Sequence, residues 1–279
     1  MKVIYSIVLL LVAVICMPAH ALVLDEMIQQ FNTPEKEQIL SPKTTEELRQ
    51  LFADANENQV PRIFIDRLPD DFAEKGDQKL YAYVLGALIL RENEKALKDK
   101  VLINLLKKKR DTQESWTDME NALFATLVEK YDVIAKKNIG SQLDQLMLKA
   151  DEIPIGMAIA QSVYDTDWGK KQMDAPYGQT GWLDEERYEA IKFDSLIKET
   201  ESYVNEMNST PNYYMWRIQR QAAAHRGAKR KHAFNFALAL RVYRPEDVMY
   251  PTAIRNIILK NPFLSRMENL TFIQDQDQK

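Results

Sequence analysis

The sequence predicts a mostly α-helical protein with at most one small β hairpin. Apolar residues recur at helical spacing along most of the 279-residue chain. Glycine is scarce, with 8 residues, which disfavours a fold built from strands and tight turns. Two capping boxes, from Thr44 to Glu47 and from Thr117 to Glu120, mark the starts of helices.

The first two helices are expected in the N-terminal part of the chain. The box at Thr44 opens a helix that runs to about residue 56. A long amphipathic pattern covers residues 78–108 and ends in the cationic run 107–110. That run could bind an anionic polymer, but a positive helix end that complements the macrodipole is the favoured interpretation.

Residues that typically begin helices or form turns predict the remaining helices and a hairpin. The box at Thr117 starts a helix that reaches about residue 131, Ser141 can cap residues 142–150, and Pro154 suits the first turn of the next helix. A short hairpin could form within residues 176–193 around Gly178 and Gly181. Further helices are expected over residues 194–207, 211–224, 233–243 and 250–260.

The first residues have the pattern of a bacterial secretory signal peptide. Lys2 precedes a short apolar run over 3–17, and an A-x-A ending places cleavage after Ala21. The run is too short for a comfortable transmembrane span, and no later apolar stretch is long enough to cross a membrane. We therefore expect an exported protein of the periplasm or cell envelope, without a stable membrane span after cleavage.

Composition excludes several classes of chemistry from the mature chain. Cys16, the only cysteine, lies in the signal peptide, so cysteine nucleophiles and thiolate metal sites are excluded. His225 and His232 are the only histidines left, which supplies a Ser-His-Asp triad or a His-rich metal site poorly. We expect no metal and no cofactor. A net charge of −4 and a pI near 5.6 argue against nucleic acid as a partner.

The helix that follows Pro154 carries the candidate site. Ala158, Gln161, Ser162 and Asp165 share one small and polar face, opposite an apolar side. Such a helix can bury its apolar side and present one carboxylate at the mouth of a groove. It can equally be an ordinary amphipathic helix with a solvated Asp near its end.

The end of this helix resembles a catalytic signature. "AQSVYDTDWG", residues 160–169, resembles the A-Q-A-x-x-E-S-G-W-G motif of bacterial peptidoglycan β-N-acetylglucosaminidases, the group that contains Bax-like proteins and the FlgJ-type domain. Asp165 falls where the family has its catalytic Glu, and Asp167 replaces a Gly. Ordered matches to the same family continue in "VPRIFIDRLP" (60–69), "LRENEK" (90–95), "FDSLIKETESYVNEMNSTPNY" (193–213) and "YRPEDVMYPTAIRNIILKN" (243–261).

The resemblance implies a lysozyme-like helical domain whose small hairpin lobe covers a glycan groove. On this basis we expect a signal peptide (1–21), a helical N-terminal region (22–150), the glucosaminidase-like domain (151–265) and a tail (266–279). The implied partner is the glycan strand of peptidoglycan, and a protein partner is not identified.

The resemblance also implies roles for single residues. Asp165 becomes the general acid, and Tyr243 and Tyr250 match two tyrosines of which one assists catalysis; Tyr250 is favoured. Glu185, beside Asp184 and Glu186 in the hairpin, is the candidate second carboxylate, or one of three solvated loop charges. Gln161 and Tyr243 are candidates for substrate binding because of their positions in the family motifs. Three aromatic residues could line sugar subsites by stacking, or could instead pack in the core: Trp168, Tyr177 and Trp182.

Three departures from the family pattern favour the second of the functional hypotheses below. Asp165 is one methylene shorter than Glu, Asp167 replaces a Gly, and the family's N-L-F-G segment is Ala175–Gly178 here, without the Asn. The first hypothesis is a metal-free peptidoglycan glucosaminidase. The second is a degenerate relative that binds glycan or an envelope partner without cleavage. A helical envelope adaptor unrelated to glycan would require the ordered matches to be chance.

Overall fold

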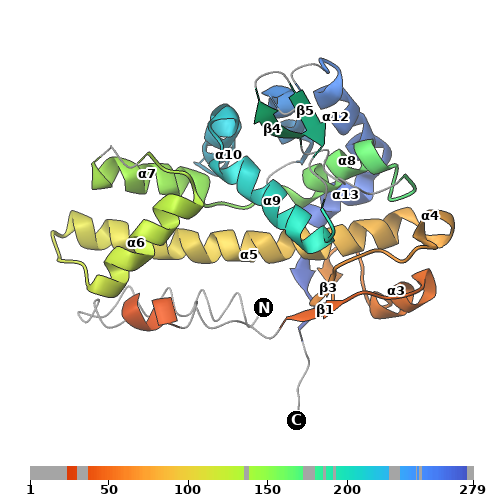
Figure 1. The fold of residues 1–279 in the computed structure, drawn as a ribbon, viewed down its shortest axis with the longest axis horizontal. Helices are drawn as coiled ribbons and strands as arrows, with labels where there is room; N and C mark the ends of the chain where they lie inside the picture. Colours follow the sequence, from red (N-terminus) through yellow and green to blue (C-terminus); the bar gives the residue numbers. More distant parts are fainter. Residues whose placement is uncertain are drawn as a thin grey trace, which may run out of the picture. The chain divides into compact units, whose positions relative to one another are not determined.

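The protein is mostly α-helical, and the residues that the structure describes also form three short pairs of β strands (Figure 1). The computed structural model describes residues 24–29, 37–134, 138–171, 180–184, 187–190, 193–225, 233–242, 244 and 247–274. The predicted mostly α-helical class is confirmed, whereas the two parallel strand pairs go beyond the single hairpin that was expected. The expected signal peptide lies outside the described residues. Within them, no helix combines the length and the apolar character needed to span a bilayer.

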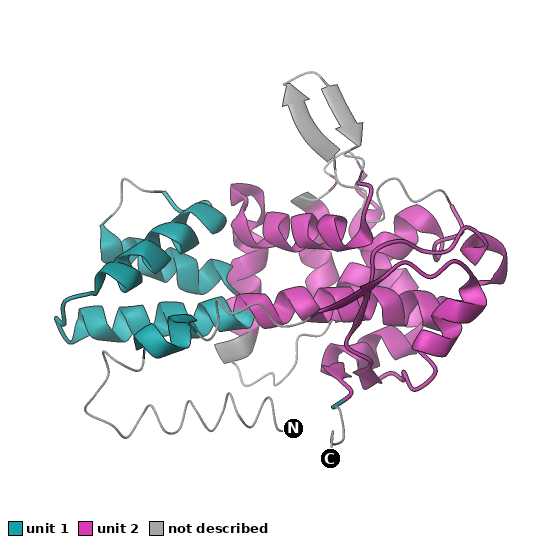
Figure 2. Cartoon of the chain, turned by 60° about the horizontal axis from the view of Figure 1, so that its bottom comes forward, with its two compact units in different colours: residues 1–36, 97–150, 274–279 teal, residues 37–96, 151–273 magenta. Residues whose placement is uncertain are grey.

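The chain forms two compact units (Figure 2). Unit 1 comprises residues 1–36, 97–150 and 274–279, and unit 2 comprises 37–96 and 151–273. The boundary at 150/151 is the predicted one, but residues 37–96 and 266–273 belong to unit 2. Both of these segments contain strands that pair within unit 2, and Met267 and Leu270 are buried in its core. Local sequence patterns do not reveal such long-range contacts.

Unit 1 is helical. It contains the second part of α5 (Gln78–Asp111), α6 (Asp118–Lys130) and α7 (Ile139–Lys149). The predicted box opens α6, because the Thr117 hydroxyl accepts from the Glu120 N–H and the Glu120 carboxylate accepts from the Thr117 N–H. The predicted cap of α7 is wrong: Asn138 caps it, and its side chain accepts from the Ser141 N–H at 2.9 Å.

The cationic end of α5 is used inside unit 1. Lys109 donates to both carboxylate oxygens of Glu120, at 2.6 and 2.8 Å, and both side chains are buried. Lys107 pairs with Asp144. A buried charge must be paired to be tolerated, so Lys109 joins α5 to α6 and is not presented to an anionic ligand.

The strands of unit 2 pair in three small sheets. β1 (Gln38–Leu40) runs parallel to β3 (Ile63–Ile65), and β2 (Gln59–Val60) runs parallel to β6 (Thr271–Phe272). The predicted hairpin is β4 (Thr180–Asp184) with β5 (Arg187–Ala190), antiparallel. Its strands are joined through residues 185–186, so Gly181 lies within β4, opposite Glu189, and not at the turn.

The longer helices of unit 2 follow the predicted ranges, but the helix that begins after Thr44 ends at Leu51 and not near residue 56. The long helix and the three predicted over 194–224 and 250–260 all occur, and residues 233–242 form a short α-helix followed by a 3₁₀ helix. The elements are α3 (Thr45–Leu51), α4 (Phe72–Lys75), the first part of α5, α8 (Ile155–Thr166), α9 (Leu196–Ser209), η1 (Pro211–Tyr213), α10 (Tyr214–His225), α11 (Ala233–Phe236), η2 (Ala237–Val242), α12 (Tyr250–Lys260), α13 (Pro262–Arg266) and η3 (Met267–Asn269).

Helix α8 lies in the core of unit 2. All of residues 155–163 are buried, and the helix packs against α12 and α13. The Glu268 carboxylate accepts from the free N–H groups of Ile155 and Gly156, at 3.1 and 2.9 Å, which satisfies them and complements the helix dipole. At Gly156 the backbones are so close that an added Cβ would lie 2.2 Å from the Leu264 carbonyl oxygen.

We expect Gly156→Ala to destabilise the protein by about 1–3 kcal/mol, because backbone atoms of α13 cannot give way to the new methyl group. The gain in helix propensity, about 1 kcal/mol, offsets only part of this loss. Gly86→Ala in α5 is the matched control, since its Cβ would meet the flexible ends of Met267 and Leu270 at 2.8 and 2.9 Å. Urea unfolding followed by circular dichroism measures both; equal stability of the two variants would contradict the packing argument.

Candidate functional site

Helix α8 ends in an unusual backbone turn. Asp167, Trp168 and Gly169 adopt φ values of 48°, 63° and 76°, so three consecutive residues are left-handed. The Asp167 N–H closes the helix on the Val163 carbonyl oxygen at 2.9 Å. Left-handed residues other than glycine are strained and persist only where the surrounding structure holds them. The turn at Asp167, Trp168 and Gly169 is therefore a conformation that the surrounding structure maintains at this helix end.

Trp168 is held in the core. It is 6% exposed, and its ring lies 6.3 Å from that of Tyr81 and 6.0 Å from that of Phe263, between ring centroids. These contacts favour the core-packing alternative for Trp168 over the sugar-stacking one. They also explain how a bulky residue is kept in a left-handed conformation.

Gln161 joins three helices of unit 2. Its side chain is fully buried; its Nε2 donates to the Tyr250 hydroxyl at 3.0 Å, and its Oε1 accepts from the Tyr203 hydroxyl at 2.7 Å. Two of the predicted site residues, Gln161 and Tyr250, are thus in direct contact. Tyr203, on α9, was not predicted, although the block 193–213 contains it.

Asp165 lies one turn beyond Gln161 and is largely buried, with a side-chain exposure of 16%. Its Oδ1 accepts from Arg244 Nη2 at 2.7 Å, and its Oδ2 is buried with no hydrogen-bond partner among the described residues. The Arg244 guanidinium in turn lies over the rings of Tyr250 and Tyr164, at 5.2 and 5.6 Å from their centroids. Arg244 was not predicted; its only signal was its position beside Tyr243.

The surroundings of Asp165 change its acidity. Burial raises the pKa of Asp165 to about 6, although the positive charges of Arg244 and Lys171 oppose the rise. Desolvation disfavours the charged form of a carboxyl group, which is the physical cause of the shift. At mildly acidic pH this carboxyl is therefore a proton donor, and at neutral pH it is mostly a carboxylate.

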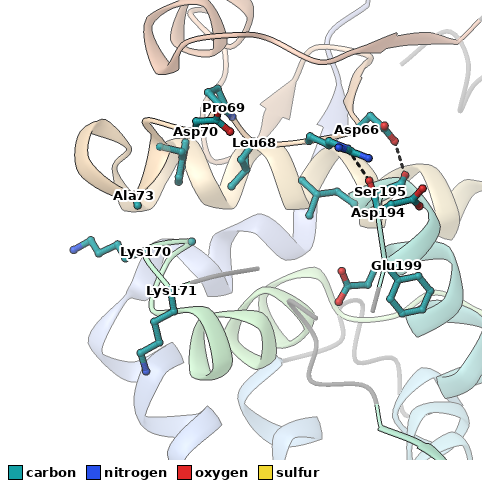
Figure 3. Close-up of a pocket in the computed structure, with 15 residues that line it drawn as sticks. Asp66, Leu68, Pro69, Asp70, Ala73, Lys170, Lys171, Asp194, Ser195 and Glu199 are labelled. Atoms are coloured by element: carbon teal, nitrogen blue, oxygen red, sulfur yellow. Dashed lines mark hydrogen bonds between the residues drawn. The ribbon is translucent and has the colours of Figure 1, made fainter. Parts of the chain in front are cut away.

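A cavity of about 470 Å³ lies beyond the end of α8 (Figure 3). One side is formed by residues 169–171, which follow the left-handed turn, and another by 193–196 with Glu199. The segment 66–70 completes the wall: the Leu196 N–H donates to the Asp66 carbonyl at 2.8 Å, and Arg67 Nε donates to the Asp194 carbonyl at 2.8 Å. Asp165 does not itself line this cavity.

Comparison of the chain with protein-family models, curated proteins and solved structures gives no match. The candidate site therefore stands on its own geometry. Tyr177, Glu185 and Tyr243 lie outside the described residues, and so does the side chain of Trp182 in β4. In the part of the chain that is described, His, Cys, Asp and Glu side chains nowhere gather in threes around a possible metal position.

The raised pKa of Asp165 predicts how the stability of the protein depends on pH. Between about pH 4 and pH 6 the folded protein binds more protons at this group than the unfolded chain, whose Asp has its ordinary pKa, so stability falls as pH rises through this window. The Asp165→Asn variant has no ionisable group at this position, so its stability does not contain this contribution. We expect its free energy of unfolding, relative to wild type, to increase by about 2–3 kcal/mol between pH 4 and pH 7.

Urea titrations at a series of pH values measure this difference. Asp247→Asn is the control, because the Tyr164 hydroxyl donates to Asp247 at 2.7 Å and the pKa of Asp247 is lowered. Its stability relative to wild type should change little over the same window and fall slightly with pH near pH 4, since the folded Asp247 stays ionised and only the unfolded chain still binds a proton there. A flat profile for Asp165→Asn would show that Asp165 is not desolvated in solution.

Proposed function

We propose that this chain is an exported glycoside hydrolase that cleaves β-N-acetylglucosaminyl bonds of bacterial peptidoglycan, with Asp165 as its general acid. The observation that carries the proposal is the buried carboxyl of Asp165 with its pKa near 6 at the end of α8. Glycoside hydrolysis needs a carboxylic acid that stays protonated long enough to protonate the leaving oxygen. Burial of one carboxyl is the usual means of keeping it so.

The arrangement around Asp165 supports this role. Arg244 holds Oδ1, so the proton of the neutral acid would reside on Oδ2, the oxygen without a protein partner among the described residues. A carboxyl fixed in this way donates its proton in one direction. The shorter reach of Asp compared with Glu is the main physical argument against high activity, since a displacement of about 1 Å can reduce a rate about a hundredfold.

Contacts between the sequence segments that resemble the glucosaminidase family also support the proposal. Arg62, in the first segment, donates to Glu94, in the second, at 2.8 and 2.9 Å. Asn93, also in the second, bonds to both backbone groups of Ile153 just before α8. Five segments scattered over the chain thus belong to one compact unit, as parts of one functional domain would.

A second candidate is a relative that binds glycan without cleaving it. The ion pair between Asp165 and Arg244 favours this alternative, because at neutral pH it keeps the carboxyl in the charged form that cannot donate a proton. This alternative expects an inactive wild type, glycan binding that survives Asp165→Asn, and activity gained in Asp165→Glu.

We expect Asp165→Asn to reduce hydrolysis by about a hundred- to ten-thousandfold with the fold intact, because Asn is nearly isosteric but supplies no proton. Asp165→Glu should preserve or raise the rate, since it restores the longer reach. Purified residues 22–279 are incubated with bacterial sacculi, released reducing ends are counted, and products are identified by mass. An active wild type with an equally active Asp165→Asn variant would remove Asp165 from the mechanism.

The rate should also depend on pH through Asp165. Because the acid must be protonated, kcat/KM should fall about tenfold per pH unit above about pH 6. Arg244 lowers the pKa of Asp165, so Arg244→Gln should move this fall in kcat/KM, the basic limb of the pH profile, to higher pH. Arg241→Gln, an exposed residue of η2, is the control and should leave the limb in place. A limb that does not respond to Arg244→Gln would belong to another group.

A further inference from the structure

Glu199 is a buried carboxylate in the wall of the cavity. It lies in the first turn of α9, is 1% exposed, and lines the cavity. Figure 3 shows its carboxylate directed into the space between the segment 193–196 and the two lysines, Lys170 and Lys171. The first turn of a helix is also where the helix dipole favours a negative side chain. A carboxylate in this position faces a space large enough for water and substrate atoms.

Helix geometry places Glu199 on the same side of the site as Asp165. The Tyr203–Gln161 hydrogen bond joins α9 to α8. Glu199 is one turn before Tyr203, and Asp165 is one turn after Gln161, so each lies on the bonded face of its helix. The end of α8 and the start of α9 both lead to the cavity, so both carboxyl groups lie on its side of this hydrogen bond.

The hydroxyl of Tyr81 is a buried group that lies against α8 and is influenced by both carboxyl groups. This hydroxyl bonds to Ser162 Oγ at 2.6 Å and to Thr166 Oγ1 at 2.9 Å, which fixes it against α8. Burial raises the pKa of Tyr81, and the negative charges of Glu199 and Asp165 raise it further. Both carboxylates therefore act on one phenol from within electrostatic range.

We propose that Glu199 is the second catalytic carboxylate of this site and accepts the proton of the attacking water. The role rests on the proposed glycoside hydrolysis and replaces Glu185 as its second carboxylate. Of the two carboxyl groups, Glu199 lines the cavity and Asp165 does not. A single displacement requires room for a water molecule between the acid and the base. The first product is then the α anomer of a β-linked glycan.

The water oxygen forms a bond to the anomeric carbon while one water proton passes to Glu199. The bond from that carbon to the glycosidic oxygen breaks, its electron pair stays on the leaving oxygen, and that oxygen takes the proton of Asp165. Glu199 is left protonated and Asp165 ionised, and exchange with solvent restores both.

The test compares Glu199→Gln with Glu201→Gln, an exposed carboxylate of the same helix. Two substrates are used: sacculi, and a dinitrophenyl β-glycoside of an N-acetylglucosamine oligomer, whose leaving group needs no protonation. Asp165→Asn should recover activity on the aryl glycoside. Glu199→Gln should lose about a hundred- to ten-thousandfold on both substrates, and Glu201→Gln should stay within about twofold of wild type. A merely structural role of Glu199 would also lower activity on both substrates, so the anomeric configuration of the product distinguishes the two roles.

Proton NMR of the first product of the wild type gives a readout that needs no variant, should Glu199→Gln fail to fold. The α anomer supports the role, and the β anomer overturns it. An active wild type with fully active Glu199→Gln overturns the role of Glu199 and leaves the proposed hydrolase standing. If neither wild type nor Asp165→Glu releases product from either substrate, the proposed hydrolase fails and the role of Glu199 falls with it.

Discussion

A primary amide without access to water must find its hydrogen bonds inside the protein, and Gln161 meets this requirement on both sides. Tyr203 donates to its oxygen and its nitrogen donates to Tyr250, so one side chain couples α8 to α9 and α12. Leaving either group unpaired in the core would be unfavourable by about 1–3 kcal/mol. The relative position of the three helices in unit 2 is therefore specified by polar pairing as well as by apolar packing.

The same constraint makes α8 a rigid support for its carboxyl group. Glu268 satisfies the N–H groups at its start, Asn93 holds Ile153 two residues before it, and Gln161 holds its middle. Asp165 follows at the last turn, where Arg244 reaches it. An acid carried by a helix that is fixed along its whole length keeps its orientation, which a carboxyl on a loop would not.

Local sequence signals predicted the longer helices and part of the candidate site. Capping chemistry and periodicity predicted α5, α6 and α9, and the i, i+4 spacing of Gln161 and Asp165 predicted their common face. The strands of two or three residues were missed because each pairs with a segment far away in sequence, as β2 does with β6. The partners of the site were missed for the same reason: Arg244 and Asp165 are 79 residues apart, and Tyr203 and Gln161 are 42 apart.

The left-handed turn after α8 links the acidity of Asp165 to a cluster of aromatic rings. Trp168 keeps its strained backbone only because Tyr81 and Phe263 enclose its side chain. Warming that loosens these rings would release the turn first, and the last turn of α8 would fray into water. Rehydrated, the Asp165 carboxyl would return toward its ordinary pKa while the remaining core was still folded. The raised pKa of Asp165 would then be lost at a lower temperature than the fold of unit 2.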